Sequence, residues 1–299
     1  MSGQRKTVLV TGIHGFTGRY MQAELVAAGY TVVGLGATPG FESNYRQVDL
    51  MNADVLKREL QKLQPDFVVH LAALAFVGHG DANAFYQVNL LGARNLLEAI
   101  AAMGKRPEGV LLASSANVYG NVSEGILAEN AMPAPANDYA VSKLAMEYLA
   151  RLYFDKMPIV ITRPFNYTGI GQSQNFLIPK IVSHFRSKAT VIELGNLDVS
   201  RDFGDVRAVV QAYRKLIETP AAAGSIINVS AGVAYSLREV VSLCEDITRH
   251  KITIKVNPTF VRENEIKFLC GDPSRLSNLL DGWEPIPLSN TLRWMLEDR

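Results

Sequence analysis

Short runs of apolar and β-branched residues recur along the first half of the chain, separated by segments in which apolar residues repeat every three or four positions. The runs lie at 7–11, 31–35, 67–72, 110–114 and 158–163. Strands that are apolar throughout are buried on both faces, which is typical of a parallel sheet covered by helices. The pattern therefore predicts an α/β fold with a doubly wound parallel sheet of the Rossmann type.

The helical segments and the later part of the chain predict how the domains are organised. One long helix is expected over 81–103 and a second from Asp138 to about Tyr153. After Pro164 the sequence becomes rich in Gly and Asn. A helix is expected near 176–187, a strand near 190–194, a helix from Asp205 to about Glu218, and a helix after the capping-box pattern at 236–239. We predict a dinucleotide-binding domain at 1–164 and a smaller α/β substrate domain at 165–299, with 205–229 returning to pack on the first.

The composition limits the partners and the compartment. With 30 basic and 29 acidic residues the net charge is +1, so the chain has no general attraction for nucleic acid or an anionic membrane. Cys244 and Cys270 form neither a CxxC pair nor a disulfide framework. The apolar stretches are too short for a signal peptide or a membrane span. We predict a cytoplasmic protein with no nucleic-acid, membrane or metal partner.

A glycine-rich turn follows the first predicted strand directly. Gly12, Gly15 and Gly18 stand between that strand and a helical segment, where glycines let the backbone approach a pyrophosphate at the helix N-terminus. A tight turn without a ligand is the alternative, but the strand before and the helix after favour a dinucleotide. The predicted cofactor contacts are Gly12, Gly15, Phe16, Thr17, Gly18, Arg19, Asp49, Leu50, Leu71, Ala72, Ala73 and Asn89, with Tyr139 and Lys143 at the nicotinamide end.

The choice of cofactor depends on the end of the second strand. That region reads GLGATPG and lacks the acid that usually binds the ribose 2′-hydroxyl of NAD. Arg19 and Arg46 could bind a 2′-phosphate, or could be solvated surface residues. NADP(H) is therefore preferred, and NAD(H) remains possible. His70 and Asn89 fit either hydrogen bonding within the core or support of the cofactor.

Tyr139 and Lys143 are candidates for proton transfer. They stand four residues apart on the second long helix and so project from one face. An ammonium group beside a phenol is expected to lower the tyrosine pKa and make it a usable acid or base. Ser115 ends the preceding core strand and can bond the same substrate oxygen. The alternative is a solvated helix face, but the order of the motifs favours Ser115, Tyr139 and Lys143 as catalytic residues.

These positions together resemble a known superfamily. The three glycines, the LAA at 71–73, Asn89, Ser115, Tyr139 and Lys143 are similar to the extended short-chain dehydrogenases/reductases, the NAD-dependent epimerase/dehydratase family. Its members act on nucleotide sugars. The resemblance covers nearly the whole chain and implies a Rossmann lobe with a smaller C-terminal lobe that holds the sugar nucleotide.

Later motifs resemble the enzymes that act on GDP-mannose derivatives, a group that includes GDP-mannose 4,6-dehydratases and GDP-6-deoxy-D-mannose reductases. The motifs are RPFNYTGIGQ at 163–172, GNLDVSRDFGDV at 195–206, RENE at 262–265 and GDPSRL before GWEP at 271–285. By this resemblance Asn166 and Arg201 would bind the diphosphate, Arg262 would add charge and Glu265 would hold the ribose. Arginines and an amide suit a diphosphate. The alternative is that the arginines pair with Asp202 or Asp205 to tie the lobes together.

The stretch SSANVYG at 114–120 narrows the expected reaction. The resembling dehydratases have a glutamate where this chain has Asn117, and an amide is no base at neutral pH. Ala116 stands where the epimerase-reductase of GDP-fucose synthesis has a cysteine, which disfavours epimerisation at carbons 3 and 5. What remains is reduction of a keto group, or a 4-epimerisation that uses the same Ser115, Tyr139 and Lys143, with Asn117 as a substrate contact.

We therefore expect GDP-4-keto-6-deoxy-D-mannose to be reduced with NAD(P)H to GDP-D-rhamnose, a deoxysugar precursor of surface polysaccharide. The opposite hydride face would give the 6-deoxytalose epimer, and the sequence leaves this open. One alternative is a nucleotide-hexose 4-epimerase with tightly bound NAD. Another is a non-catalytic dinucleotide sensor, against which the intact Ser115, Tyr139 and Lys143 argue.

The two long helices carry more apolar residues than one sheet face requires. The residues are Phe85, Val88, Leu91, Leu96, Leu144, Tyr148 and Leu152. Related enzymes pair these helices into a four-helix bundle, so we predict a two-fold homodimer. The alternative is that every one of these side chains packs on its own sheet.

Overall fold

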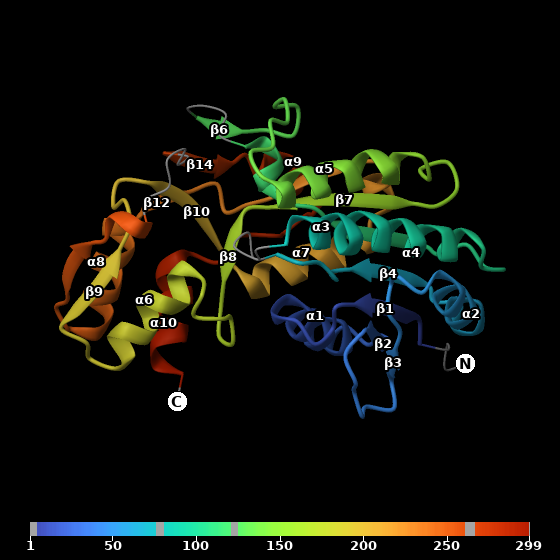
Figure 1. The fold of residues 1–299 in the computed structure, drawn as a ribbon, viewed down its shortest axis with the longest axis horizontal. Helices are drawn as coiled ribbons and strands as arrows, with labels where there is room; N and C mark the ends of the chain where they lie inside the picture. Colours follow the sequence, from blue (N-terminus) through green and yellow to red (C-terminus); the bar gives the residue numbers. More distant parts are fainter. Residues whose placement is uncertain (1–4, 76–80, 121–124, 261–266, 299) are drawn as a thin grey trace.

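The computed structural model describes residues 5–75, 81–120, 125–260 and 267–298 (Figure 1). Its largest sheet has seven strands in the order β11-β7-β5-β4-β1-β2-β3, and all of its pairings are parallel. The strands are β1 Thr7–Thr11, β2 Thr31–Gly36, β3 Tyr45–Gln47, β4 Phe67–His70, β5 Gly109–Ala113, β7 Ile159–Pro164 and β11 Ile226–Val229. The chain proceeds outward from β1 to one edge and from β4 to the other, so the predicted Rossmann-type sheet is confirmed.

The strands are apolar throughout because both faces of the sheet are buried. Val8 and Val10 pack into one core cluster, while Leu9 between them packs into the other, and all three are inaccessible to solvent. The first face is covered by α1 Phe16–Ala27 and α7 Val206–Glu218, and the second by α2 Ala53–Leu63, α4 Gly92–Ala101 and α5 Asp138–Arg151 (Figure 1). Burial of this kind stabilises the sheet by roughly 25 cal/mol for each Å² of apolar surface.

The first long helix is present but is not uniform. It comprises α3 Ala82–Phe85, a π-helical segment η1 Tyr86–Leu91, and α4. Asn89, at the centre of the wide turn, is fully buried, and π-helical turns often mark functional positions. The second predicted helix is α5, whose first turn is capped by the Asn137 side chain accepting a hydrogen bond from Ala140 N at 2.9 Å.

A second lobe lies beside the sheet (Figure 1). It holds a five-stranded sheet of β12 Ala234–Ser236, β10 Ser200–Asp205, β14 Phe268–Gly271, β6 Ile126–Leu127 and β8 Asn166–Thr168, and a pair of β9 Val191–Leu194 with β13 Thr253–Val256. Its helices α6 Leu177–Arg186, α8 Leu237–Thr248 and α10 Leu288–Glu297 share one apolar core. The remaining short helices of the described chain are η2 Ala116–Tyr119, η3 Pro220–Ala222, η4 Pro258–Phe260 and α9 Ser274–Leu279. The capping box expected before α8 is confirmed.

Several segments cross between the lobes. β11 joins the large sheet beside β7, and α7 packs on α1. Leu276, Leu280 and Trp283 also enter the core of the first lobe, where Trp283 Nε1 donates to Ala208 O at 3.1 Å. Conversely, β6 comes from the part of the sequence that forms the first lobe, but it pairs with β14 in the sheet of the second lobe. The prediction was that 205–229 returns to the first lobe. We propose that this segment, from the start of α7, belongs to the first lobe together with 274–283.

Among the described segments, every helix falls short of the length and apolarity that a bilayer span requires.

Candidate active site

The glycine turn after β1 has the geometry that a bound pyrophosphate requires. Gly12 has a φ of +71°, and a Cβ on it would lie 2.8 Å from Ala72 N at the end of β4. A Cβ on Gly18, inside α1, would lie 2.2 Å from Gly12 O. Only glycines allow this approach of helix, turn and neighbouring strand. Gly15 precedes α1 and has no side chain to cap it, so the first N–H groups of the helix are available to an anion.

The turn lies where the strand order changes direction, between β1 and β4. Leu71, Ala72 and Ala73 follow β4 at this edge and are partly buried, while Asp49 and Leu50 follow β3. The Asp49 carboxylate accepts a hydrogen bond from Met51 N at 2.9 Å, which holds it next to buried Leu50. In parallel α/β sheets this switch point is where ligands bind.

The residues after β2 can serve either form of the dinucleotide. Arg46 lies on β3 opposite Leu35, donates to Ser43 O at 3.1 Å and Tyr45 O at 3.0 Å, and remains exposed, as Arg19 does. The sequence analysis missed Glu42, whose carboxylate lies 3.3 Å from His14 Nε2 at the glycine turn. A guanidinium suits a 2′-phosphate and a carboxylate suits a 2′-hydroxyl, and this part of the fold carries a residue of each kind.

His70 and Asn89 both make hydrogen bonds within the core. His70 Nδ1 lies 2.7 Å from Thr11 Oγ1, which also accepts from Ala72 N at 3.2 Å. Asn89 Oδ1 accepts from Leu74 N at 2.9 Å, and its two N–H groups donate to Leu74 O and Ser142 Oγ. Since Asn89 is fully buried with both donors used, it positions the 71–74 segment against α5. These contacts match the first of the two alternatives, hydrogen bonding within the core, and a direct contact with the cofactor stays a prediction.

The structure brings Ser115, Tyr139 and Lys143 together at the end of β5. Ser115 begins η2 and accepts a hydrogen bond from Asn117 N at 3.1 Å, which leaves Asn117 partly buried beside it. Tyr139 and Lys143 are 7% and 3% exposed, so the alternative of a solvated helix face is wrong. Lys143 Nζ donates to Ala113 O at 2.8 Å.

The pKa of Tyr139 differs from the expectation. Burial raises the pKa of Tyr139 to about 12, and a hydrogen bond with Ser115 only partly opposes this. Burial also lowers the pKa of Lys143 to about 8, against the field of Glu147. We expected Lys143 to lower the tyrosine pKa, but loss of hydration on burial is the largest effect on Tyr139 and raises its pKa instead. At neutral pH Tyr139 is therefore a neutral phenol that can donate a proton.

Two of the predicted substrate contacts, Asn166 and Arg201, lie on strands of the second lobe. Asn166 begins β8 and is exposed, and the residue opposite it on β10 is Phe203. Arg201, on β10, is partly buried and donates to Ser200 O at 2.8 Å. The predicted Arg262 and Glu265 lie outside the described residues.

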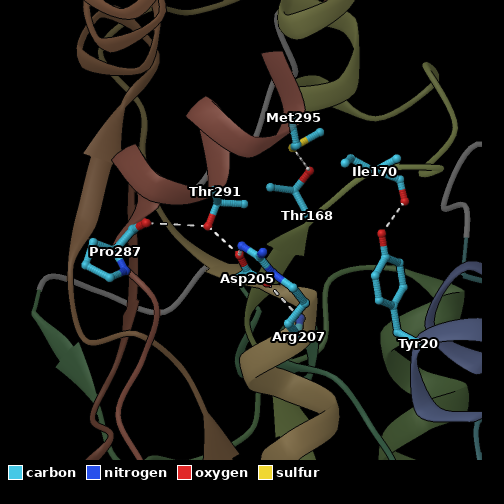
Figure 2. Close-up of polar contacts among 8 residues, drawn as sticks. All are labelled: Tyr20, Thr168, Ile170, Asp205, Arg207, Pro287, Thr291 and Met295. Carbon is cyan, nitrogen blue, oxygen red and sulfur yellow. Dashed lines mark hydrogen bonds and ion pairs between the residues drawn. The ribbon is translucent and has the colours of Figure 1, made fainter. Parts of the chain in front are cut away.

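The two aspartates proposed as alternative partners for the arginines have other contacts. The Asp202 carboxylate accepts from Ala231 N at 3.0 Å and Gly232 N at 2.9 Å. Asp205 accepts from Arg207 Nη2 at 2.6 Å and from Thr291 Oγ1 at 2.7 Å, which fixes α10 to the start of α7 (Figure 2).

The cofactor turn and the second lobe are joined by hydroxyl groups. Thr17 Oγ1 lies 2.8 Å from the Tyr167 hydroxyl, next to Asn166. Tyr20, one turn later on α1, donates to Ile170 O at 2.7 Å (Figure 2). The sequence alone could not identify these contacts, because the partners lie 150 residues apart. Within the described ranges, no cluster of three or more His, Cys, Asp or Glu could hold a metal ion.

Comparison with known proteins agrees with this geometry. A family model described as GDP-mannose 4,6 dehydratase matches residues 9–292. The chain belongs to that family. The predicted membership of the extended short-chain dehydrogenase/reductase superfamily is thereby confirmed.

Curated relatives of this family member include two with related names. GDP-6-deoxy-D-talose 4-dehydrogenase of Aggregatibacter actinomycetemcomitans is 39% identical over 91% of this chain and 90% of its own length. GDP-6-deoxy-D-mannose reductase of Pseudomonas aeruginosa is 36% identical over 97% of this chain and 96% of its own.

Solved structures of similar proteins share the whole architecture. A candidate epimerase from Burkholderia cenocepacia J2315 is 49% identical, with a TM-score of 0.93 over 98% of this chain and 97% of the other. RMD from Pseudomonas aeruginosa, solved in complex with NADPH, is 35% identical, with a TM-score of 0.84 over 97% of this chain and 98% of the other.

Proposed function

We propose that this protein reduces the 4-keto group of GDP-4-keto-6-deoxy-D-mannose with a nicotinamide dinucleotide as hydride donor. The observation that carries the proposal is the neutral, buried phenol of Tyr139 beside Ser115, with an amide at Asn117 where a dehydratase needs a base. Such a site can protonate a developing alkoxide. Asn117 cannot remove the carbon-bound proton that an elimination requires.

The residues divide the chemistry of reduction among them. A bound, reduced nicotinamide supplies the hydride. Tyr139 donates its proton to the ketone oxygen as negative charge develops there, and Ser115 donates a hydrogen bond to the same oxygen. The ammonium of Lys143 stabilises the phenolate that Tyr139 becomes. The tyrosine must then be reprotonated before the next turnover.

NADP(H) is the preferred cofactor in this proposal, and NAD(H) is the possible alternative. Gly12, Gly15 and Gly18 would hold the pyrophosphate, with Phe16 and Thr17 in the first turn of α1. The complex of RMD with NADPH supports this preference. The exposed Arg46 supplies a cation beside the end of β2, and Glu42 is the nearby acceptor through which NAD(H) could also bind.

The substrate is inferred from the named relatives. GDP-6-deoxy-D-mannose and GDP-6-deoxy-D-talose differ only at carbon 4, so one 4-keto sugar connects both names. We propose GDP-D-rhamnose as the product, in deoxysugar synthesis. The talose epimer is a second candidate, which the relative with 39% identity favours. Asn166, Arg201 and Asn117, with Arg262 and Glu265, would hold the nucleotide sugar.

A 4-epimerase that keeps its NAD is the second candidate function, since the candidate epimerase from Burkholderia is 49% identical. An epimerase regenerates its cofactor within each turnover, whereas a reductase releases the oxidised form.

We also propose a cytoplasmic location for the protein, supported by the free thiols of buried Cys244 and Cys270.

One experiment separates these functions. The protein is incubated with NADPH or NADH and with GDP-, dTDP- and UDP-linked 4-keto sugars, and the configuration at carbon 4 of the product is determined by NMR. We expect oxidation of NADPH with the GDP sugar and a rhamnose product. If the cofactor is not oxidised with any 4-keto sugar, the reductase proposal fails. Interconversion of 4-hydroxy sugars without added cofactor would establish the epimerase instead.

We also propose a two-fold homodimer formed by α5 and the α3–η1–α4 helix. Leu91, Val141, Tyr148 and Leu152 on these adjacent helices are 40%, 38%, 57% and 72% exposed. Phe85 and Leu96 are buried in the protomer's own core and are not available to a partner, contrary to the expectation. A surface of this kind on neighbouring helices suits a self-complementary interface.

Light scattering at micromolar concentration is expected to give twice the chain mass of 32.8 kDa. Leu152→Glu should yield the single-chain mass, because a carboxylate would have to be buried at the interface. Val26→Glu is the control, since Val26 is an equally apolar, 56% exposed residue on α1, across the sheet. A monomeric wild-type protein would refute the dimer.

A further inference from the structure

A buried ion pair lies directly behind the catalytic lysine. Tyr139, Lys143 and Glu147 follow one another at four-residue intervals on α5 and so share one face. The Glu147 side chain is 1% exposed and the Arg163 side chain, on β7, is 2% exposed. Neither residue has a place in the reaction described above. Arg163 is a charged residue in a strand, IVITRP, whose other residues are mostly apolar. This unusual position is the sequence signal by which the ion pair could have been found.

The glutamate carboxylate is held by three hydrogen bonds. Arg163 donates through Nη2 to Oε2 at 2.6 Å and through Nε to Oε1 at 2.9 Å, a two-pronged contact. Ser114 Oγ also donates to Oε1 at 2.6 Å. Ser114 is the residue before Ser115. The carboxylate therefore connects the catalytic helix to the strand end that carries the catalytic serine.

Arg163 is in turn fixed from its other side. Its guanidinium lies over the Tyr119 ring, with its central carbon 4.8 Å from the ring centroid. The Tyr119 hydroxyl donates to Asn228 Oδ1 at 2.7 Å, and Asn228 Nδ2 donates to Leu127 O at 2.8 Å. The pair thus belongs to a network that also includes Tyr119, the last residue of η2.

Stability alone does not account for a charged pair at this place. Removing two ions from water costs several kcal/mol for each, and well-packed apolar residues of similar volume often serve a core as well or better. The position of the ion pair next to Lys143 offers another reason for its presence. Lys143 is 3% exposed, and burial by itself disfavours its charged form.

The groups that face Lys143 have different charges. His70, on β4, is neutral at physiological pH because burial lowers its pKa to about 3. Tyr139 is a neutral phenol because burial raises its pKa. Glu147 is the negative group and raises the pKa of Lys143, and Arg163 on β7 is paired with that carboxylate. The carboxylate of Glu147 is therefore the charge that favours the protonated form of the lysine.

We propose that Glu147, held by Arg163, is a positioning residue that keeps Lys143 charged and fixes Ser114, and thereby Ser115, against α5. The role of Lys143 as the group that supports Tyr139 rests on the proposed function. The effect of the Glu147 charge on the protonation of Lys143 does not depend on the proposed function, and it can be measured without any substrate.

The first test replaces Glu147 by Gln, which keeps the shape and removes the charge. In protein with ¹³C-labelled lysine, the Lys143 resonance is assigned as the one missing in Lys143→Met and is then titrated. Wild-type Lys143 is expected to lose its proton near pH 8. In Glu147→Gln the midpoint should fall by about one pH unit or more, as for a lost opposite charge at short range.

The pH profile of turnover should move with this titration. Lys143 is charged below its pKa, so activity is present there and is lost as the pH rises through it. The alkaline limb of kcat should therefore shift to lower pH in Glu147→Gln. Ser114→Ala removes a hydrogen bond without changing charge. It should therefore lower kcat, while the pH of the alkaline limb of the kcat profile stays the same as in the wild-type protein. Glu24→Gln is the control, because Glu24 accepts from Arg214 at 2.7 Å on the other face of the sheet.

A double variant covers the case in which Glu147→Gln fails to fold. Glu147→Leu with Arg163→Met removes both charges and fills the volume, and buried pairs replaced in this way usually fold. It should melt near the wild-type temperature and still titrate Lys143 at lower pH. An unchanged Lys143 midpoint in the folded variant would overturn the proposal. If the wild-type enzyme reduces no 4-keto sugar, the proposed function fails, but the titration result stands.

Discussion

Replacing Tyr139 by phenylalanine is expected to reduce kcat by roughly 10²-fold or more while leaving NADPH binding nearly unchanged. The change removes only the hydroxyl that would protonate the alkoxide. The ring is 7% exposed and packs edge-on against Phe85, with the ring centroids 5.9 Å apart, so phenylalanine fits the same space. Single-turnover oxidation of NADPH measures the loss, and the quenching of protein fluorescence by NADPH measures binding.

Tyr148→Phe is the matched control for this prediction. Tyr148 lies on the same helix, but it is 57% exposed and projects away from the sheet. Its hydroxyl should make no difference to turnover. Comparable activity in Tyr139→Phe and the wild-type protein would remove Tyr139 from the mechanism.

Gly18→Ala should abolish measurable dinucleotide binding and destabilise the fold by about 1–3 kcal/mol, the usual cost of inserting a methyl group into packed structure. The new Cβ would lie 2.2 Å from Gly12 O and 2.5 Å from Ile13 O. Because these are backbone atoms of the phosphate-binding turn, α1 must move away from it. Urea unfolding and titration with NADPH measure the two effects.

Gly104→Ala provides the control for the glycine prediction. A Cβ at Gly104 would meet only Gln64 Oε1, at 3.8 Å, which is an ordinary contact. Both binding and stability should therefore stay close to wild type. If Gly18→Ala binds NADPH as the wild-type protein does, the turn does not approach the cofactor as proposed.

The features predicted most accurately are those that depend on neighbouring residues. The strand expected at 7–11 is β1 Thr7–Thr11, because its three apolar residues, Val8, Leu9 and Val10, stand between β-branched threonines and are buried on both faces of the sheet. The common face of Tyr139 and Lys143 follows from helical spacing alone. The glycine turn was predictable for the same reason, since its glycines lie within seven residues of sequence.

The features that local spacing could not predict depend on burial. A lysine beside a tyrosine was expected to lower the tyrosine pKa, yet the pKa of Tyr139 is raised because its phenol is withdrawn from water. For Asn89 the sequence left two roles open, and the structure shows that its amide makes hydrogen bonds within the core. Spacing along a helix gives the direction of a side chain but not the amount of water that reaches it.

By itself, then, the sequence determined the sheet, the turn and the helix face that carries Tyr139 and Lys143, because each arises from contacts between residues close along the chain. Only the tertiary structure decided which distant groups meet. Cys270 on β14 pairs with Ile126 on β6, and the Arg163 side chain on β7 reaches Glu147 on α5. These contacts depend on the order of strands and on what each side chain loses in hydration, and neither property is present in a local pattern of residues.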